Sequence, residues 1–229
     1  MDFDAVYYEP ASLSFELGKQ LKEQFYDLPW IPIENHNSIE EMREKENSEF
    51  SKMKRNLIVG TRKTHKYVEN HKVSDYLVPY TSSGCTAMCL YCYLVCNYNK
   101  CAYLRLFVNR EQMLDRLIKK SKNSEIPLTF EIGSNSDLVL ENTITNNLLY
   151  TIPRFAEEGA GSLTFPTKFH MVDSLLDLPH KGKVIFRMSV NPQRLISRIE
   201  LSMWTVNCSG NAGRRLESDV YRAFGTAAR

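Results

Sequence analysis

The sequence predicts an α/β protein, in which strands alternate with helices around a parallel sheet. From Tyr76 onward, short apolar runs of strand character are followed by polar loops and then by segments with helical periodicity. This alternation is typical of βα units. The 229 residues are 43% hydrophobic and 24% charged, so the chain can bury a sizeable core and suits one domain with an extension.

The first 75 residues lack this alternation, and we expect them to form an N-terminal α+β extension (1–75). Apolar residues at helical spacing predict a helix over 14–26. The two prolines of LPWIPIEN require an extended connector. A polar helix over 38–54 and a short strand, RNLIVGT, complete this part.

The elements of the second part follow in order from Tyr76. Strands are predicted at DYLVPYT, YLRLFV, PLTFEIG, GSLTFPTK and GKVIFRMSV. Helices are predicted at NREQMLDRLIKKSK, at ENTITNNLLYTIPRFAEEG with a break at Pro153, at VDSLLDLPH and at NPQRLISRIE. Sites in barrels and open α/β sheets lie at the carboxyl ends of strands. We therefore expect the functional site in the loops TSSGC, GSNSD, TKFH and SVNPQ.

The last 29 residues, 201–229, break this rhythm. Their basic residues are all Arg, and no clear strand follows. We expect an atypical tail that is foreign to the architecture, as after a frameshift or a mispredicted gene end. A genuine small helix at DVYRAFGTAA is the alternative.

Composition and charge narrow the class of protein. No apolar run approaches the roughly 20 residues of a membrane helix, and the acidic N-terminus MDFDAVYYEP does not resemble a secretory signal. We therefore expect a cytoplasmic protein with reduced thiols, in which six cysteines favour metal or catalytic use over disulfides. The net charge is only +2, but seven basic residues and one acid between Lys52 and Lys72 could face phosphates or form a solvated surface.

Four of the six cysteines lie in GCTAMCLYCYLVC, after the predicted strand DYLVPYT. Cys85, Cys89 and Cys92 form a C-x3-C-x2-C motif, whose thiolates can hold three corners of a 4Fe–4S cluster and leave one iron open. An open iron can chelate S-adenosyl-L-methionine, whose reductive cleavage yields a 5'-deoxyadenosyl radical. The spacing and Tyr91 fit the radical S-adenosylmethionine (radical SAM) superfamily. With Cys96, four cysteines could instead close the zinc site of a non-catalytic module.

A closer resemblance covers about residues 5–200. VYYEPASLSFELGKQL, KRNLIVGTRKT, CLYCYL, YLRLFVN, FEIGSNSDLVLEN, LTFPTKF and MSVNPQ resemble the spore photoproduct lyase family, in the same order. The resemblance implies a partial (β/α)6 TIM-type radical SAM barrel over 76–200, here truncated at the C-terminus. It implies a carbon–carbon lyase that reverses the lesion 5-thyminyl-5,6-dihydrothymine in UV-damaged DNA. The implied cofactors are a 4Fe–4S cluster and S-adenosyl-L-methionine, and the implied partner is a reductant such as a flavodoxin or ferredoxin.

The same resemblance assigns roles to single residues. Cys85, Cys89 and Cys92 are expected to hold the cluster, and Tyr91 is expected near the adenine. Ser136, Lys168 and Ser189 resemble positions that contact S-adenosyl-L-methionine, and Tyr93 matches a tyrosine implicated in returning the radical to it. Each of these residues alone could equally cap a loop or pack at the edge of the core.

One position departs from the family pattern, because Ser134 stands where the family has its hydrogen-donor cysteine. An alcohol O–H bond is much stronger than a thiol S–H bond, so Ser134 is not expected to donate a hydrogen atom to a carbon radical. Either another thiol serves, for which Cys96 and Cys101 are candidates, or the enzyme is a radical SAM protein of the same lineage with another substrate. Cys96 and Cys101 could also be buried hydrophobes or auxiliary ligands.

Overall fold

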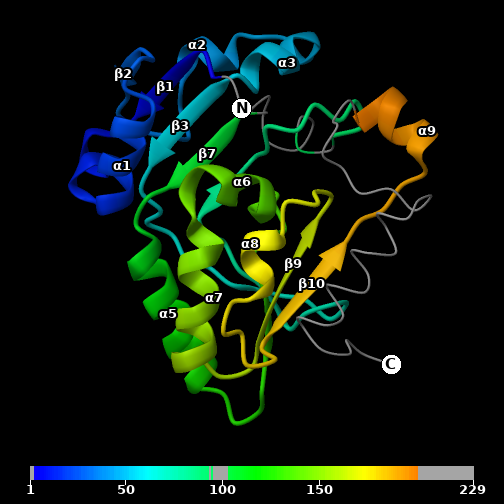
Figure 1. Cartoon of the computed structure of the whole chain (residues 1–229). Coiled ribbons are helices and arrows are strands. Elements are labelled where there is room, and N and C mark those ends of the chain that lie inside the picture. The colour runs from blue at the N-terminus through cyan, green and yellow to red at the C-terminus, as the bar shows by residue number, and fades with distance from the viewer. Residues whose placement is uncertain (1–2, 93, 95–102, 201–229) are drawn as a thin grey trace.

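The computed structural model describes residues 3–92, 94 and 103–200, and its strands form two sheets (Figure 1). The first sheet has the order β2-β1-β3-β7-β6, and the second has the order β10-β9-β8-β5-β4. The first comprises β1 (Ala5–Tyr8), β2 (Trp30–Pro32), β3 (Asn56–Gly60), β6 (Ser82–Ser83) and β7 (Leu104–Phe107). The second comprises β4 (Val68–Glu69), β5 (Tyr76–Leu77), β8 (Thr129–Glu131), β9 (Ser162–Thr167) and β10 (Val184–Met188).

Both sheets are mostly parallel, although the βα alternation from Tyr76 onward predicted only one parallel sheet. In the first sheet only β6 runs antiparallel to its neighbour, and in the second only β4 does. Both sheets combine strands from either side of residue 75. The mixed α/β class is confirmed, but no closed barrel forms within the described residues, and the expected truncated barrel is not confirmed.

The pairing of the predicted strand YLRLFV shows where the structure differs from the expected barrel. It forms β7, which pairs with β3 of the N-terminal part rather than with β5 or β8. Leu104 and Leu106 of β7 are buried in the same apolar cluster as Leu57 and Val59 of β3. Burying a side chain of this size contributes about 1.5–3 kcal/mol, so shared burial fixes the pairing.

The helices confirm most local predictions. They are α1 (Glu16–Gln24), α2 (Glu40–Arg43), α3 (Phe50–Met53), α5 (Arg110–Lys122), α6 (Leu138–Thr145), α7 (Asn147–Glu158), α8 (Asp173–Leu176) and α9 (Gln193–Leu195). Three short turns of other helix types are η1 (Pro10–Ser14), η2 (Asn47–Glu49) and η3 (Ile196–Glu200). The single polar helix predicted over 38–54 is wrong, because this segment forms α2, η2 and α3 instead.

The break predicted at Pro153 is also misplaced. The chain breaks between α6 and α7 at Asn146, which adopts a left-handed conformation with φ 53° that asparagine tolerates well. Pro153 lies inside α7. The neighbouring side chains of Ile152 and Phe155 are fully buried, and this packing outweighs the backbone hydrogen bond that proline removes.

Helices α5, α7 and α8 cover one face of the second sheet (Figure 1). Between them lies the main core, in which Leu117 of α5 and Phe155 of α7 pack in one cluster with Phe130 and Phe165 of the sheet. A smaller core lies between the first sheet and α1. Within the described part of the chain, none of the helices combines the length and the apolar character needed to cross a membrane.

Candidate functional site

A cavity of about 250 Å³ lies where β8, β9 and β10 end, and the cysteine loop forms its opposite wall. We call it the cysteine cavity. Its lining includes all predicted site residues that the structure describes: Cys85, Cys89, Cys92, Tyr91, Ser136, Lys168 and Ser189. The remaining candidates, Tyr93, Cys96 and Cys101, lie outside the described residues. Segments far apart in the sequence therefore meet at the strand ends, as the loop argument predicted.

A buried lysine from the N-terminal part holds the cysteine loop. The side chain of Lys54 is among the largest that are fully buried, and its Nζ donates to the carbonyl oxygen of Cys85 at 2.7 Å. The same ammonium lies 3.9 Å from Sγ of Cys92. Lys54 thus places a positive charge beside the thiols, where thiolates and an anionic group would gain from it. It belongs to the basic stretch noted in the sequence, but nothing in its pattern marked it as buried.

The three thiols are largely shielded from solvent. Burial raises the pKa of the Cys85 thiol to about 12, although the nearby Lys54 charge acts in the opposite direction. Burial also raises the pKa of Cys89. Within the described ranges, no group of three Cys, His, Asp or Glu side chains is already arranged to hold a metal ion.

The donor chemistry nevertheless fits an iron–sulfur cluster. The cysteine cavity offers three thiol sulfurs within eight residues of one loop, and soft sulfur ligands select such clusters. Beside them the cavity offers a lysine and three serine hydroxyls, which can hydrogen-bond to the amino and carboxylate groups of a small cofactor. Cys85, Cys89 and Cys92 could therefore hold the cluster.

A buried carboxylate, Glu200, joins two of the predicted cofactor contacts. Its Oε1 accepts hydrogen bonds from the Tyr91 hydroxyl, from Lys168 Nζ at 3.2 Å and from Asn191 Nδ2 at 2.7 Å. The side chain of Glu200 is only 1% exposed. Burial acts to raise its pKa, but the three hydrogen bonds outweigh burial and hold the pKa below its usual value. The Lys168 ammonium also lies 5.3 Å from the centre of the Tyr91 ring.

Asp137 ties the carboxyl end of β9 to the start of α6. Its carboxylate accepts hydrogen bonds from Thr167 Oγ1 at 2.8 Å, from the backbone N–H of Lys168 at 3.0 Å and from the backbone N–H of Leu140 at 3.2 Å. The last of these caps α6. Burial raises the pKa of Asp137 despite these donors. Asp137 therefore fixes the backbone from which Lys168 enters the cavity.

A second carboxylate, Glu141, anchors the strand that precedes the cysteine loop. Its oxygens lie 2.6 Å from the Ser82 hydroxyl, 3.2 Å from the Thr81 hydroxyl and 2.5 Å from Nδ2 of Asn147. The Ser82 hydroxyl in turn lies 2.6 Å from the Ser136 hydroxyl. Sequence reasoning missed Glu141, Asp137 and Glu200, because each resembles an ordinary helix carboxylate until the fold buries it.

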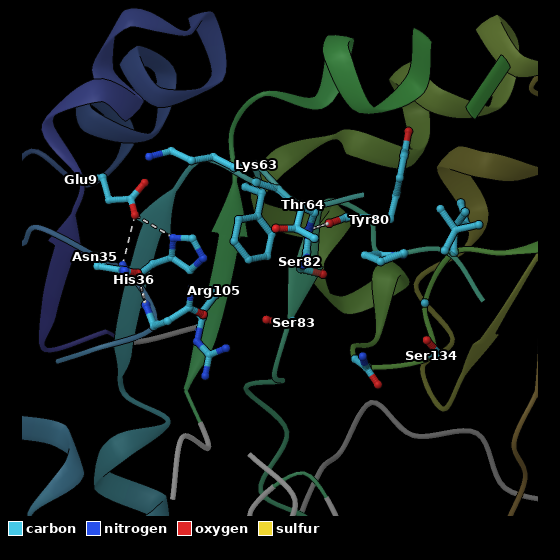
Figure 2. Close-up of a pocket in the computed structure, with 18 of the residues that line it drawn as sticks. Glu9, Asn35, His36, Lys63, Thr64, Tyr80, Ser82, Ser83, Arg105 and Ser134 are labelled. Carbon is cyan, nitrogen blue, oxygen red and sulfur yellow. Dashed lines mark hydrogen bonds and ion pairs between the residues drawn. The ribbon is translucent and has the colours of Figure 1, made fainter. Parts of the chain in front are cut away.

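Ser134 lies where two cavities meet. It lines the cysteine cavity and also a larger cavity of about 480 Å³, which we call the seam cavity because its lining combines residues of the first sheet with residues that follow β5 and β8 of the second. Figure 2 shows this cavity, with Glu9 and His36 on one side and Ser134 on the other. Sequence reasoning identified no site in the seam cavity.

Comparisons with known proteins identify the family of this chain. A family model described as spore photoproduct lyase matches residues 2–223, beyond the 5–200 over which the resemblance was expected. A spore photoproduct lyase of Bacillus subtilis (strain 168) is 35% identical over 200 residues, which cover 85% of this chain and 58% of that protein. One of Geobacillus sp. (strain Y412MC61) is 32% identical over 222 residues, which cover 95% of this chain and 64% of that protein.

Solved structures give the same result. A spore photoproduct lyase complexed with dinucleoside spore photoproduct matches with a TM-score of 0.83 at 30% identity, over 96% of this chain and 65% of that one. A double mutant of the enzyme with bound AdoMet and dinucleoside spore photoproduct matches equally well. The chain thus spans about 58 to 65% of the length of these relatives.

Proposed function

Because this chain belongs to the spore photoproduct lyase family, we propose that it reverses spore photoproduct, 5-thyminyl-5,6-dihydrothymine, in UV-damaged DNA as a radical SAM carbon–carbon lyase. The observation that carries the proposal is the cysteine cavity, whose lining combines the C-x3-C-x2-C cysteines with Tyr91, Lys168 and three serines. Relatives with this fold bind AdoMet and dinucleoside spore photoproduct.

The residues of the cysteine cavity take the following roles in this proposal. Cys85, Cys89 and Cys92 hold a 4Fe–4S cluster, which supplies the electron that cleaves S-adenosyl-L-methionine. Lys168 and the hydroxyls of Ser136 and Ser189 bind polar groups of that cofactor, and Tyr91 lies against its adenine. Asp137 positions Lys168 through the backbone N–H that it accepts at 3.0 Å. Lys54 holds the loop and places a positive charge beside Cys92.

The hydrogen donor in the proposed reaction is a thiol other than residue 134. Ser134 lines the junction of the two cavities, where a reacting base could reach it, but its O–H bond is too strong for donation to a carbon radical. We assign the role to Cys96 or Cys101, and the return of the radical to Tyr93. Ser134 is also the observation that favours a second function, a radical SAM enzyme of the same lineage with another substrate.

Wider features of the family complete the proposal. We infer that the second sheet belongs to a partial (β/α)6 barrel over 76–200, with 1–75 as an extension and 201–229 as an atypical tail. In support, β5, β8, β9 and β10 run parallel, and helices lie between β8, β9 and β10 in the chain. We further propose that the protein acts in the cytoplasm and that a flavodoxin or ferredoxin supplies the electron.

Anaerobic reconstitution with iron and sulfide tests the proposal. The expected result is a broad visible absorbance, about four irons per chain, 5'-deoxyadenosine from reductive cleavage of S-adenosyl-L-methionine, and a dinucleotide with two intact thymines from a synthetic spore photoproduct dinucleotide. Cys89→Ala is expected to lose the cluster and all of these products. In the same assay, Cys96→Ala and Cys101→Ala identify the donor, because its loss lowers the thymine yield without loss of iron.

Two other outcomes would contradict the proposal. Cofactor cleavage without any thymine from the lesion would favour the alternative enzyme with another substrate. Stoichiometric zinc with no cluster would exclude both enzymes and favour a zinc-binding module.

A further inference from the structure

Three cationic side chains line the seam cavity, which the proposed radical chemistry does not use. They are Arg62 and Lys63, from the basic stretch that follows β3, and Arg105 from β7. The lining also carries hydroxyls, including those of Ser82 and Ser83. The cavity measures about 480 Å³, a volume typical of small-molecule sites. A pocket with this lining is suited to an anion.

Arg105 is the central group of this cavity. Only 9% of its surface is exposed, and its Nε has no hydrogen-bond partner. It stands opposite Ser83 in the antiparallel pairing of β6 and β7, so both side chains lie on the same face. Figure 2 shows Arg105 beside Ser83, below the His36 ring. A buried donor without an acceptor is costly, and an oxyanion is the acceptor that best matches a guanidinium.

The carboxylates near Arg105 do not supply that acceptor. Glu9 accepts hydrogen bonds from Thr61 N–H at 2.9 Å, from the Thr61 hydroxyl at 3.2 Å, from His36 N–H at 3.1 Å and from His36 Nδ1 at 2.7 Å. The carboxylate of Glu9 is therefore engaged by Thr61 and His36, and Figure 2 marks its contacts with His36. Glu34 is exposed to solvent.

Two arginine charges act on His36 at the edge of the cavity. Burial lowers the pKa of His36, and the charges of Arg105 and Arg62 lower it further, whereas Glu9 acts in the opposite direction. Arg62 is held as a wall of the cavity, because its Nε donates to the Tyr80 carbonyl at 2.9 Å and its guanidinium lies 3.8 Å from the centre of the Phe107 ring.

We propose that the seam cavity binds a phosphate group, held by Arg105 and Lys63 with help from the Ser83 hydroxyl. The site is separate from the cysteine thiols, so its binding does not depend on the proposed lyase reaction. A phosphate could come from the DNA backbone or from a free nucleotide. If the phosphate belongs to DNA, the site rests on the proposed function and adds a contact for its substrate. Ser134 lines both cavities, so a DNA strand could extend from one cavity to the other.

Binding measurements on the full chain test this proposal. The probes are a fluorescent single-stranded oligothymidylate, followed by anisotropy, and inorganic phosphate or thymidine monophosphate as competitors. We expect Arg105→Met to weaken binding at least tenfold and Lys63→Met to weaken it several-fold. In each variant the slope of log affinity against log salt concentration should decrease by about the contribution of one phosphate contact. Lys52→Met is the matched control, since Lys52 belongs to the same basic stretch but is 73% exposed and lies outside the cavity.

The two sources give different patterns. An oligonucleotide that binds tightly and is displaced only weakly by the monophosphate identifies the DNA backbone. A monophosphate that binds in an Arg105-dependent way while the oligonucleotide does not identifies a free nucleotide. Either pattern supports the phosphate site.

Equal binding of both probes by Arg105→Met, Lys63→Met and Lys52→Met would overturn the proposal. If Arg105→Met fails to unfold cooperatively, Lys63→Met and Arg105→Lys provide the test, since Lys63 is exposed and the second change keeps the charge. The binding assay measures no radical product. Failure of the phosphate proposal is therefore distinguished from failure of the proposed lyase function.

Discussion

The two cavities share Gly133 and Ser134 but differ in what surrounds them. The cysteine cavity is lined by thiols and apolar side chains, with Lys168 held by the buried Glu200. The seam cavity is lined by three cationic side chains, two glutamates and several hydroxyl groups. A sulfur-ligated cofactor needs the first kind of surrounding, and a charged polymer or nucleotide needs the second. One loop after β8 therefore lines two cavities that differ chemically.

The wall between the cavities is fixed by a short chain of polar groups. Ser82 lines the seam cavity, Ser136 lines the cysteine cavity, and their hydroxyls lie 2.6 Å apart. The Ser82 hydroxyl also donates a hydrogen bond to Oε2 of Glu141 at 2.6 Å. Changes to this wall should affect both cavities, whereas changes at Lys54 or His36 should affect only one. The three predictions below test this difference.

Glu141→Ala is expected to have the largest effect. It leaves the buried donors of Thr81, Ser82 and Asn147 without their acceptor. Each unsatisfied buried group costs about 1–3 kcal/mol, so the free energy of unfolding should fall by roughly 3 kcal/mol or more. Urea unfolding measures this loss. Reconstituted iron content and oligothymidylate binding should both decrease, because both cavities lose the same wall.

Glu141→Gln is the matched control, since it keeps the shape and one acceptor oxygen. It should cost clearly less than the alanine variant. If alanine lowers only one of the two binding activities while the chain stays folded, the cavities are not joined through this wall.

Lys54→Met should have a smaller effect, confined to the cysteine cavity. It leaves the Cys85 carbonyl without the ammonium that donates to it at 2.7 Å, a loss of about 1–3 kcal/mol that relief of a buried charge partly offsets. Without the positive charge near Cys92, the reduced and more negative form of a bound cluster is less stabilised. We therefore expect a more negative reduction potential, measured by redox titration with EPR detection.

Two further variants sharpen this test. Lys54→Arg keeps the charge and should retain most of the potential, and the exposed Lys52→Met should change nothing. A potential that is the same in Lys54→Met and the unchanged chain would show that Lys54 only supports the loop. Phosphate binding in the seam cavity should be equal in all of these variants.

Features that depend on local sequence could be predicted. The helix over 109–122 has its own periodicity and basic last turn, and it appears as α5 (Arg110–Lys122). The C-x3-C-x2-C spacing and the polar loops at the strand ends were enough to predict that Cys85, Ser136 and Lys168 lie at one cavity. In each case the signal lies within one short segment.

Features that depend on distant partners could not be predicted. The strand at YLRLFV was predicted, but its pairing with β3 was not. This pairing depends on the burial of Leu104 and Leu106 in the core of the first sheet, for which no local sequence pattern gives a signal. Lys54 and Glu200 resembled solvated helix charges, and only the tertiary fold places them beside Cys85 and Lys168. The proposed choice of Cys96 or Cys101 as hydrogen donor likewise depends on which thiol lies near Ser134 in space.

His36 gives the smallest and most local prediction, on the seam side. Its Nδ1 lies 2.7 Å from Glu9, which favours the protonated ring, but burial outweighs this and, with Arg105 and Arg62, lowers the pKa of His36 below 6.5. In the unfolded chain the imidazole takes up its proton as the pH falls through about 6.5, whereas in the folded chain it does so only at lower pH. The unfolded state then binds more protons, so the free energy of unfolding should fall on acidification through this window.

His36→Gln should remove this part of the pH dependence and leave a later fall below pH 4.5, where the lowered pKa of Glu9 acts with the same sign. Urea unfolding at several pH values between about 5 and 7.5 measures the difference, which should be about 1 kcal/mol or less, the size of a single ordinary interaction. Cluster content should not change with the substitution, since His36 does not line the cysteine cavity. If the unchanged chain instead became more stable as the pH fell through this window, the Glu9 contact would outweigh burial and the two arginine charges. The seam cavity would then hold an imidazolium next to Arg105, and its attraction for phosphate would rise at low pH.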